Sequence, residues 1–230
     1  MKAFLLAAGV GARLRPITNS TPKCLVEIGA RPLLDIWLDA LEKAGVNEVL
    51  VNTHHLADQV VAHVACRLDP PTVRLSHEPV LLGSAGTLRA NRDFVVSEDM
   101  FLVLNADNLT DFDLRRLIDV HCAGRAVATL AVFRAARPSE CGIVEVDDEG
   151  RVVGFVEKPS VPRTDLANAG IYAFSPKVLD EIPHAGPSDI GFDLLPRVLG
   201  RARTVPLGVC YFMDIGSPAA LQQARDEWKY

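Results

Sequence analysis

The chain has 230 residues, of which 49% are hydrophobic and 23% are charged. These proportions are typical of a compact globular protein, and they exclude a disordered chain, a coiled coil and a collagen-like fibre. Lysine and arginine total 24 against 29 aspartate and glutamate, which gives a formal net charge of -5. Because no basic surplus exists to neutralise a nucleic-acid backbone, we expect no nucleic-acid partner.

The N-terminus and the cysteines indicate a cytoplasmic protein. The first apolar run is short and ends at Gly9, Gly11 and Arg13, unlike the core of a signal peptide. No apolar stretch reaches the roughly 18 residues that span a bilayer, so we expect no membrane partner. The five cysteines are scattered without a CxxC pair, which is typical of reduced thiols.

Predicted strands and helices alternate through the first half of the chain. Residues 2–8 form an apolar run typical of a strand that is buried on both faces. Apolar residues at helical spacing then predict a helix over 32–43, which Gly45 ends before a strand over 48–52. The alternation continues with a helix over 56–68, a strand over 73–77, a helix over 84–92 and a strand over 100–104. This order predicts a parallel, doubly wound sheet.

The second half has a different pattern. Residues 127–133, 142–146 and 152–157 alternate or pair, and the turn over 147–150 predicts a hairpin between the last two runs. The predicted fold class is therefore α/β, a Rossmann-like three-layer α/β/α arrangement with a mixed, mainly parallel central sheet. Since no linker or internal repeat is visible, we expect one domain over residues 1–230.

A glycine-rich loop over residues 8–13 follows the first strand. Ligands of doubly wound sheets bind beyond the carboxyl ends of the strands, and glycines let backbone N–H groups approach a phosphate there. A tight turn is the alternative interpretation. The cations Arg13, Arg15 and Lys23 favour a triphosphate. No GK[ST] follows and Leu14 replaces a third glycine, so neither the Walker pattern nor the dinucleotide pattern is present.

The string LAAGVGARLRPIT, followed by TPK, resembles the GxGTRLxPxT…PK signature of the sugar-1-phosphate nucleotidyltransferases, or nucleotide-sugar pyrophosphorylases. Ala12 stands where that family commonly has threonine. Further matches follow in the family's order: EP with LGSAG, LNAD, FVEKP, NAGIY and FMDIG. They are most similar to the mannose-1-phosphate guanylyltransferase branch, although Phe212 replaces a tryptophan. The resemblance spans nearly the whole chain and implies a GT-A-like nucleotidyltransferase fold.

Two aspartates are candidate Mg²⁺ ligands. Asp107 follows the apolar strand over 100–104, and Asp214 lies in the apolar stretch 210–215, where a charge is costly without a metal or a hydrogen-bond donor. The alternative role of Asp107 is that of a helix N-cap or a turn former. The resemblance implies that both aspartates hold Mg²⁺ between the α-phosphate and the sugar phosphate.

The sugar-phosphate side is predicted from residues further along the chain. Lys158 follows the predicted strand over 152–156 and suits the phosphate, while the adjacent Glu157 would accept hydrogen bonds from sugar hydroxyls. The alternative is a surface Glu–Lys pair of little energetic value. Gly142 and Asn168 match family positions that contact the hexose.

The nucleotide side rests on the glycine-rich loop and on Glu78. A carboxylate at Glu78 would accept from N1–H and the 2-amino group of guanine together, which favours GTP, but it would also accept the single N3–H of uracil or thymine. His54 and His55 are interpreted as structural. The expected nucleotide-binding residues are Leu6, Ala8, Gly9, Gly11, Ala12, Arg13, Lys23, Glu78, Gly83 and Asn105.

The implied reaction is attack of a sugar-1-phosphate oxygen on the α-phosphorus of a nucleoside triphosphate, with release of pyrophosphate. Its nucleophile is already anionic, so catalysis consists of alignment and charge neutralisation. We expect Arg13, Lys23 and Asp107 to be catalytic, with Arg13 and Lys23 on the triphosphate.

The predicted partners are a nucleoside triphosphate, GTP favoured, and a hexose- or heptose-1-phosphate. The product would be of the GDP-mannose or GDP-manno-heptose type. Alternatives are a uridylyl- or thymidylyltransferase for another sugar phosphate, and a catalytically silent nucleotide-sugar sensor. An NAD-dependent oxidoreductase is disfavoured by the missing third glycine. We expect no C-terminal β-helix, and a monomer or homodimer.

Overall fold

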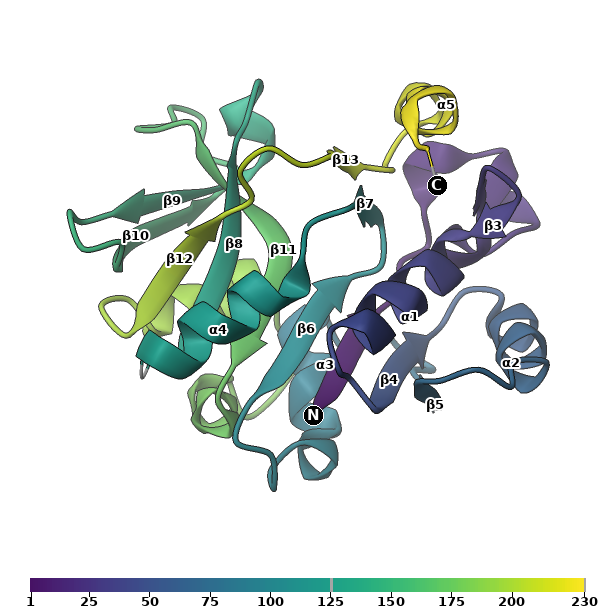
Figure 1. The fold of residues 1–230 in the computed structure, drawn as a ribbon, viewed down its shortest axis with the longest axis horizontal. Helices are drawn as coiled ribbons and strands as arrows, with labels where there is room; N and C mark the ends of the chain where they lie inside the picture. The colour runs from purple at the N-terminus through teal and green to yellow at the C-terminus, as the bar shows by residue number, and fades with distance from the viewer. Residues whose placement is uncertain (125, 230) are drawn as a thin grey trace. The chain divides into compact units, whose positions relative to one another are not determined.

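The computed structural model describes residues 1–124 and 126–229, and it divides into two compact units (Figure 1). Arg125 and Tyr230 lie outside the described residues. The first unit comprises Met1–Leu81, Leu104–Asp113 and Cys210–Tyr230, and the second comprises Leu82–Val103 and Leu114–Val209. The chain therefore crosses between the units four times, and strand β6 (Phe101–Asn105) contains one of the crossings.

The first unit contains a parallel sheet of the strands β1 (Lys2–Leu6), β4 (Glu48–Thr53) and β5 (Thr72–His77). β1 pairs with β4, and β4 pairs with β5, both in parallel. The predicted strands are confirmed, except that β1 ends at Leu6 instead of residue 8. The reason is that the next N–H, of Ala7, donates to the side chain of Asn52 at 2.7 Å instead of continuing the ladder.

Helix α1 (Leu33–Lys43) lies in front of β1 and β4 in Figure 1. It buries one apolar face, and Trp37 in the middle of that face donates its Nε1–H to the carbonyl oxygen of Asn108 at 2.8 Å. Helix α2 (Ala57–Ala65) is shorter than the predicted span of 56–68. Both predicted helices are confirmed, with the boundaries shifted by one to three residues.

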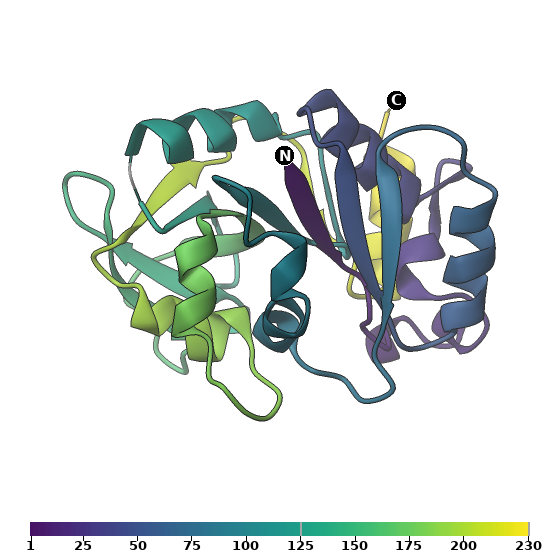
Figure 2. The same cartoon turned by 90° about the horizontal axis from the view of Figure 1, so that it is seen from below.

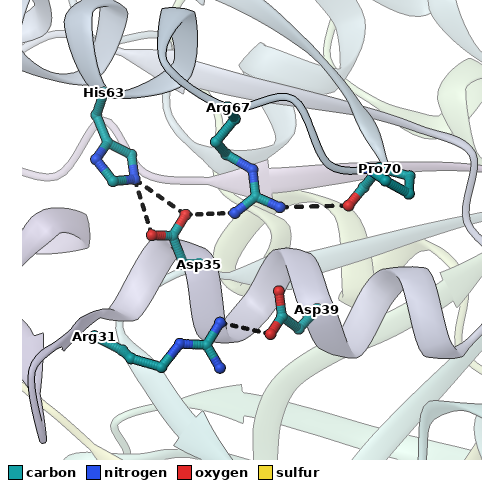
Figure 3. Close-up of polar contacts among 6 residues, drawn as sticks. All are labelled: Arg31, Asp35, Asp39, His63, Arg67 and Pro70. Atoms are coloured by element: carbon teal, nitrogen blue, oxygen red, sulfur yellow. Dashed lines mark hydrogen bonds and ion pairs between the residues drawn. The ribbon is translucent and has the colours of Figure 1, made fainter.

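The half-buried carboxylate of Asp35 joins α1 to α2 and to the turn before β5 (Figure 3). Asp35 Oδ1 accepts from Arg67 Nη1 at 2.7 Å, and both carboxylate oxygens lie 3.0 Å from His63 Nε2. Arg67 Nη2 also donates to the carbonyl oxygen of Pro70 at 3.3 Å. Because one group contacts two elements, the connection holds both helices in a fixed register.

Short elements complete the first unit. β7 (Asn108–Thr110) pairs with β13 (Phe212–Asp214) in antiparallel fashion, so the segment after β6 and the C-terminal segment adjoin. Helix α5 (Pro218–Glu227) begins at Ser217, whose Oγ accepts the N–H of Ala220. The remaining elements are β2 (Glu27–Ile28), β3 (Arg31–Pro32), and the single turns η1 (Ala12–Leu14), η2 (Ile17–Asn19) and η3 (Lys23–Leu25).

The second unit is built on a mixed sheet. Its strands are β8 (Ala128–Arg134), β9 (Gly142–Val146), β10 (Val152–Glu157), β11 (Leu166–Phe174) and β12 (Ala202–Pro206). β8 is parallel to β12 and antiparallel to β11, and β9 and β10 form the predicted antiparallel hairpin. Its turn is closed by Asp147 Oδ1, which accepts the N–H groups of Glu149 and Arg151.

Helices cover this second sheet. α4 (Leu114–Gly124) packs on β8, β11 and β12 and is the teal helix at the upper left of Figure 2. The π-helical turn η7 (Ile190–Leu194) and the turn η8 (Leu195–Arg197) pack against β10. The remaining elements are α3 (Ser84–Ala90), η4 (Arg92–Phe94), η5 (Pro138–Glu140) and η6 (Pro176–Glu181).

The predicted α/β class with a mixed, mainly parallel sheet is confirmed. The sequence patterns did not predict the elements α4, β11, β12 and α5. Within the described residues, no helix is long and apolar enough to cross a membrane.

Candidate active site

Thr18 fixes the shape of the glycine-rich loop after β1. Gly11 adopts a left-handed conformation, with φ of 66°, which glycine accepts at no cost. The buried Thr18 donates its Oγ1–H to the carbonyl oxygen of Gly11 at 2.8 Å, and a Cβ at Gly11 would stand 2.8 Å from Thr18 Cγ2. The loop is therefore fixed in shape and tolerates no side chain at Gly11.

Part of this loop is exposed, and no other segment of the described chain packs against it. A Cβ added at Gly9 would meet no heavy atom within 4 Å, and Gly9 and Ala12 are exposed while Ala8 is buried. The loop is joined to the neighbouring strand end because Leu6 accepts the N–H of Ala106 at 3.0 Å. Leu6 and Asn105, the last residues of β1 and β6, are each half-buried. This geometry leaves space for a phosphate against the backbone of residues 8–12.

Lys23 is the buried cation of the first unit. Its residue is only 8% exposed, yet its Nζ lies 2.8 Å from Asp107 Oδ2 and 3.8 Å from Asp214 Oδ1. Burial of an ammonium group is tolerated only where carboxylates compensate its charge. Lys23 therefore joins two carboxylates that lie more than a hundred residues apart in the sequence.

Asp214 reaches this place through the pairing of β13 with β7. It lies opposite Asn108, and the next residue, Ile215, donates its N–H to the carbonyl oxygen of Asp107 at 2.8 Å. The Asp214 side chain is 52% exposed, and its partial burial raises the pKa of the carboxyl. The charge of Asp107 raises that pKa further, while Lys23 and Arg13 lower it. An additional cation at this place would be bound favourably, because it would relieve the repulsion between the two carboxylates.

Arg13 lies beside Asp214 in a space that Gly216 provides. Arg13 Nη2 is 3.5 Å from Asp214 Oδ2, and the guanidinium is largely exposed. A Cβ at Gly216 would stand 2.6 Å from Arg13 Nη2 and 2.9 Å from Asp214 Oδ1. The glycine of the FMDIG string thus lets the guanidinium approach the carboxylate closely.

The carboxylate pair fits a Mg²⁺ ion that is shared with a ligand. The described residues contain no group of three or more histidine, cysteine, aspartate or glutamate side chains able to hold a metal. Mg²⁺, however, is usually held by one or two carboxylates together with phosphate oxygens and water. Asp107 and Asp214 supply that number of carboxylates, next to a loop with an open face.

Glu78 is buried within the first unit, with 2% of its surface exposed. Its Oε1 accepts from Asn52 Nδ2 at 2.9 Å, and the Oδ1 of Asn52 accepts the N–H of Ala7. His54 Nδ1 lies 2.7 Å from the carbonyl oxygen of Glu78, and His55 Nε2 lies 2.7 Å from that of Thr18. Both histidines thus contact main-chain groups, and Asn52 connects Glu78 to the glycine-rich loop.

Gly83 lies in the second unit, at the start of α3. Its φ of 76° is left-handed, and a side chain there would overlap the carbonyl oxygen of Ser188. The same oxygen accepts the N–H groups of Ala85 and Gly86 at 2.9 and 3.0 Å. Gly83 is therefore required by this close approach of two backbone segments.

Glu157 and Gly142 lie opposite each other in the β9–β10 pair. A Cβ at Gly142 would stand 2.6 Å from Glu157 Oε2, so the carboxylate lies directly over the glycine. Burial raises the pKa of Glu157, the Lys158 charge lowers it and the Asp189 charge raises it. Lys158 is exposed, has a φ of 46°, and donates its N–H to Cys141 at 3.0 Å.

The Asn168 side chain is bonded within the second unit. Its Nδ2 donates to the hydroxyl oxygen of Tyr172 at 2.6 Å, and its Oδ1 accepts the N–H of Gly170 at 3.2 Å. Burial raises the pKa of Tyr172, and the charge of Glu157 raises it further. Asn168 therefore orients the hydroxyl group of Tyr172.

The structure thus brings Arg13, Lys23, Asp107 and Asp214 together in the first unit, and Gly142 and Glu157 together in the second. Residues without a predicted role also shape these places. Thr18 and Gly216 stand inside motif strings, so the strings were the signal for them. Asn52 gave only a weak signal, as an amide that ends an apolar strand. Gly191, which also contacts Glu157, gave none.

Known proteins are similar to this chain over almost its whole length. The sequence model of the family described as "Nucleotidyl transferase" matches residues 2–229. The mannose-1-phosphate guanylyltransferase catalytic subunit beta of Drosophila melanogaster is 36% identical over 221 residues, which cover 94% of this chain and 60% of that protein. The UTP--glucose-1-phosphate uridylyltransferase of a Synechocystis strain is 34% identical, covering 86% of this chain and 55% of that protein.

This chain therefore spans less than two thirds of the length of these two curated relatives. Among solved structures, HddC from Yersinia pseudotuberculosis complexed with GMP-PN matches with a TM-score of 0.83 and 24% identity. That match covers 99% of both chains. It is a similarity of fold.

Proposed function

The chain belongs to the nucleotidyl transferase family, and we propose that it transfers a nucleotidyl group from a nucleoside triphosphate to a sugar-1-phosphate. GMP is the favoured group and a hexose- or heptose-1-phosphate the favoured acceptor. The products would be pyrophosphate and a nucleotide-diphosphate sugar of the GDP-mannose or GDP-manno-heptose type. The observation that carries this proposal is the convergence of Lys23 on Asp107 and Asp214, with Arg13 beside them.

The proposed chemistry needs charge balance more than acid–base groups. A sugar-1-phosphate oxygen is already anionic, so attack on the α-phosphorus is limited by repulsion between anions and by alignment. Arg13 and Lys23 would bind the triphosphate and the leaving pyrophosphate. Asp107 and Asp214 would hold Mg²⁺, which, when bound, withdraws negative charge from phosphate oxygens. These roles use every charged group of the cluster.

The sugar-phosphate side is proposed to lie in the second unit. Lys158 would bind the phosphate, and Glu157 would accept hydrogen bonds from sugar hydroxyls. Gly142 would leave room for the carboxylate, and Asn168 would act through Tyr172. The close contact of Glu157 with Gly142 supports the roles proposed for these two residues.

The preference for guanine rests on Glu78 and on the relatives. The Asn52 amide orients the Glu78 carboxylate, whereas the 2% exposure of Glu78 does not favour contact with a base edge. Relatives named as guanylyltransferase and as uridylyltransferase are 36% and 34% identical to this chain, so the names favour guanine only slightly. Uridylyl or thymidylyl transfer to another sugar phosphate is the alternative activity.

Pyrophosphate release tests the proposal directly. The protein is incubated with Mg²⁺ and with each of GTP, UTP, dTTP, CTP and ATP, paired in turn with mannose-, glucose-, N-acetylmuramic acid- and manno-heptose-1-phosphate. We expect release with GTP and a manno-configured sugar phosphate. Release with UTP or dTTP alone would establish the alternative activity instead. If no combination releases pyrophosphate while nucleotide binding is retained, the result would favour a catalytically silent nucleotide-sugar sensor.

The organisation of the protein is part of the proposal. Residues 1–230 are proposed to act as a single catalytic domain, as a monomer or a homodimer. Size-exclusion chromatography with light scattering distinguishes the two states by mass.

A further inference from the structure

The Glu157 carboxylate has an unusual environment. It stands at the end of β10 and is half-buried, yet in the described part of the chain no side chain or N–H group donates a hydrogen bond to it or pairs with it. A carboxylate that loses water without gaining a donor costs free energy, so proteins seldom leave one in this state without a function. The group is therefore poised for donors that a ligand supplies.

Two glycines from distant parts of the chain enclose one oxygen of this carboxylate. A Cβ at Gly142 on β9, or at Gly191 on η7, would stand 2.6 Å from Glu157 Oε2. Such a separation is shorter than a non-bonded contact allows, so a methyl group at either position displaces the carboxylate. Glu157 Oε2 thus lies in a slot between two backbone segments.

Position 191 requires glycine because a side chain there has no space. Gly191 has no left-handed φ, so its backbone is one that any residue adopts. The methyl of an alanine there would meet Glu157 Oε2 at 2.6 Å and the carboxyl carbon at 3.3 Å, whereas its distance to Phe155 would be an ordinary 3.6 Å. The residue also lies in a π-helical turn, and such turns are frequent at functional sites.

We propose that Gly191 is a positioning residue for the sugar-1-phosphate: its missing side chain lets the Glu157 carboxylate lie at the depth and angle at which it accepts hydrogen bonds from sugar hydroxyls. This inference rests on the proposed function. Because Oε2 is enclosed by the backbone of β9 and η7, the carboxylate is oriented before the ligand arrives, and little conformational entropy is lost on binding.

Kinetics of Gly191→Ala test this role. We expect the KM for the sugar-1-phosphate to rise about tenfold or more, since a displacement near 1 Å is enough to disrupt an aligned contact. The KM for the nucleoside triphosphate should stay within about twofold, because the phosphate cluster belongs to the other unit. Gly154→Ala is the matched control: it adds a methyl group on β10 itself, where the nearest atoms belong to the Glu145 side chain. Equal effects on both Michaelis constants, or an equal effect of the control, would overturn the proposal.

A shorter acidic side chain provides the rescue. Glu157→Asp withdraws the carboxylate by one methylene, so in the Gly191→Ala background the added methyl group has less to displace. We expect the double variant to bind sugar phosphate at least about threefold better than the product of the two single effects. Simple multiplication of the effects would mean that Gly191 acts elsewhere. If Gly191→Ala fails to fold, a folded double variant still locates the clash at Glu157, and an unfolded one contradicts the proposal.

A readout without turnover separates this proposal from the proposed function. In protein labelled with ¹³C at the glutamate carboxyls, the Glu157 signal is assigned by its loss in Glu157→Gln and is followed by NMR against pH. We expect its titration midpoint to change in Gly191→Ala and to stay unchanged in Gly154→Ala. An unchanged midpoint in both variants overturns the positioning role even if the enzyme is active. A changed midpoint in a protein that turns over no sugar phosphate would show that Gly191 positions the Glu157 carboxylate, and the lack of turnover would refute the proposed function.

Discussion

The two units treat their candidate carboxylates in opposite ways. In the first unit Asp107 and Asp214 lie within 4 Å of Lys23, and Arg13 adds a second cation beside Asp214. In the second unit Glu157 has no ion-pair or hydrogen-bond partner among the described residues, and two glycines enclose it. The difference matches the different ligands that are proposed for the two places.

The ligand's charge explains the contrast. A triphosphate and Mg²⁺ bring large charges of both signs, so a balanced set of two cations and two carboxylates exchanges partners without leaving any charge uncompensated. Sugar hydroxyls are neutral and donate single hydrogen bonds, so the carboxylate that receives them is most effective if no protein cation is hydrogen-bonded to it. Four substitutions in the cluster of the first unit test its half of this contrast.

The largest effect is expected at Asp107. Asp107→Asn removes one of the two proposed metal carboxylates and the 2.8 Å partner of Lys23. We expect kcat to fall by at least about 1,000-fold, the scale of lost transition-state charge stabilisation, while the circular dichroism spectrum stays native. Asp58→Asn, on the exposed face of α2, is the control. A near wild-type rate for Asp107→Asn would refute the metal assignment.

Lys23→Met removes one of the two cations of the cluster and leaves both carboxylates in place. Two carboxylates then face each other without their buried cation, so we expect kcat to fall about 100-fold and the free energy of unfolding to fall by about 1–3 kcal/mol. Lys43→Met, at the exposed end of α1, should change neither quantity. Thermal unfolding at pH 7 and at pH 4 is the measurement that checks the stability effect. The loss should be smaller at pH 4, where protonation relieves the repulsion, and a loss independent of pH would contradict the pairing.

A smaller effect is expected at Gly216. Gly216→Ala pushes the Arg13 guanidinium away from Asp214, since the added Cβ would stand 2.6 Å from Arg13 Nη2. Because the arginine is exposed and flexible, we expect only about a fivefold rise in the KM for the nucleoside triphosphate. The same substitution in an Arg13→Ala background should have no further effect. A full additional effect there would show that Gly216 does not act through Arg13.

The smallest effect concerns pH and stability. Burial and the Asp107 charge raise the pKa of Asp214 in the folded protein, so ionisation of this group costs stability as pH rises from about 3.9 through the raised native pKa. Asp214→Asn removes that cost. We expect its Tm at pH 7 and without Mg²⁺ to exceed that of the wild type by about 1–2 °C, and the two values to coincide near pH 3, where both forms are neutral. A lower Tm at pH 7 would mean that the cations outweigh the burial.

Several parts of the fold and the site were predictable because their signals are local. The strands over 48–52 and 142–146 are continuous apolar or alternating runs, and the glycine-rich loop follows directly on β1. Asp107 was identified because it stands just after a buried strand, where a carboxylate is unusual. The helix α4 was not predicted, although Leu114 and Leu117 have helical spacing and are buried.

Other parts depend on contacts that no local pattern records. In the sequence, Lys23 is one of several cations in a loop, and only the fold buries it between Asp107 and Asp214. Asn52 reads as the end of a strand, and only the neighbouring strand reveals its bond to Glu78. In the same way, Gly191 resembles any glycine in a turn until η7 is seen packed against β10.

The sequence by itself determined the composition of the protein, the order of the strands and helices in its first half, and the strings that identify its family. The tertiary structure alone decided which charges are paired and which carboxylate stays without a partner. The physical reason is range. Apolar periodicity and turn chemistry act over a few neighbouring residues, whereas burial, ion pairing and the space around a side chain depend on segments that meet only when the chain is folded.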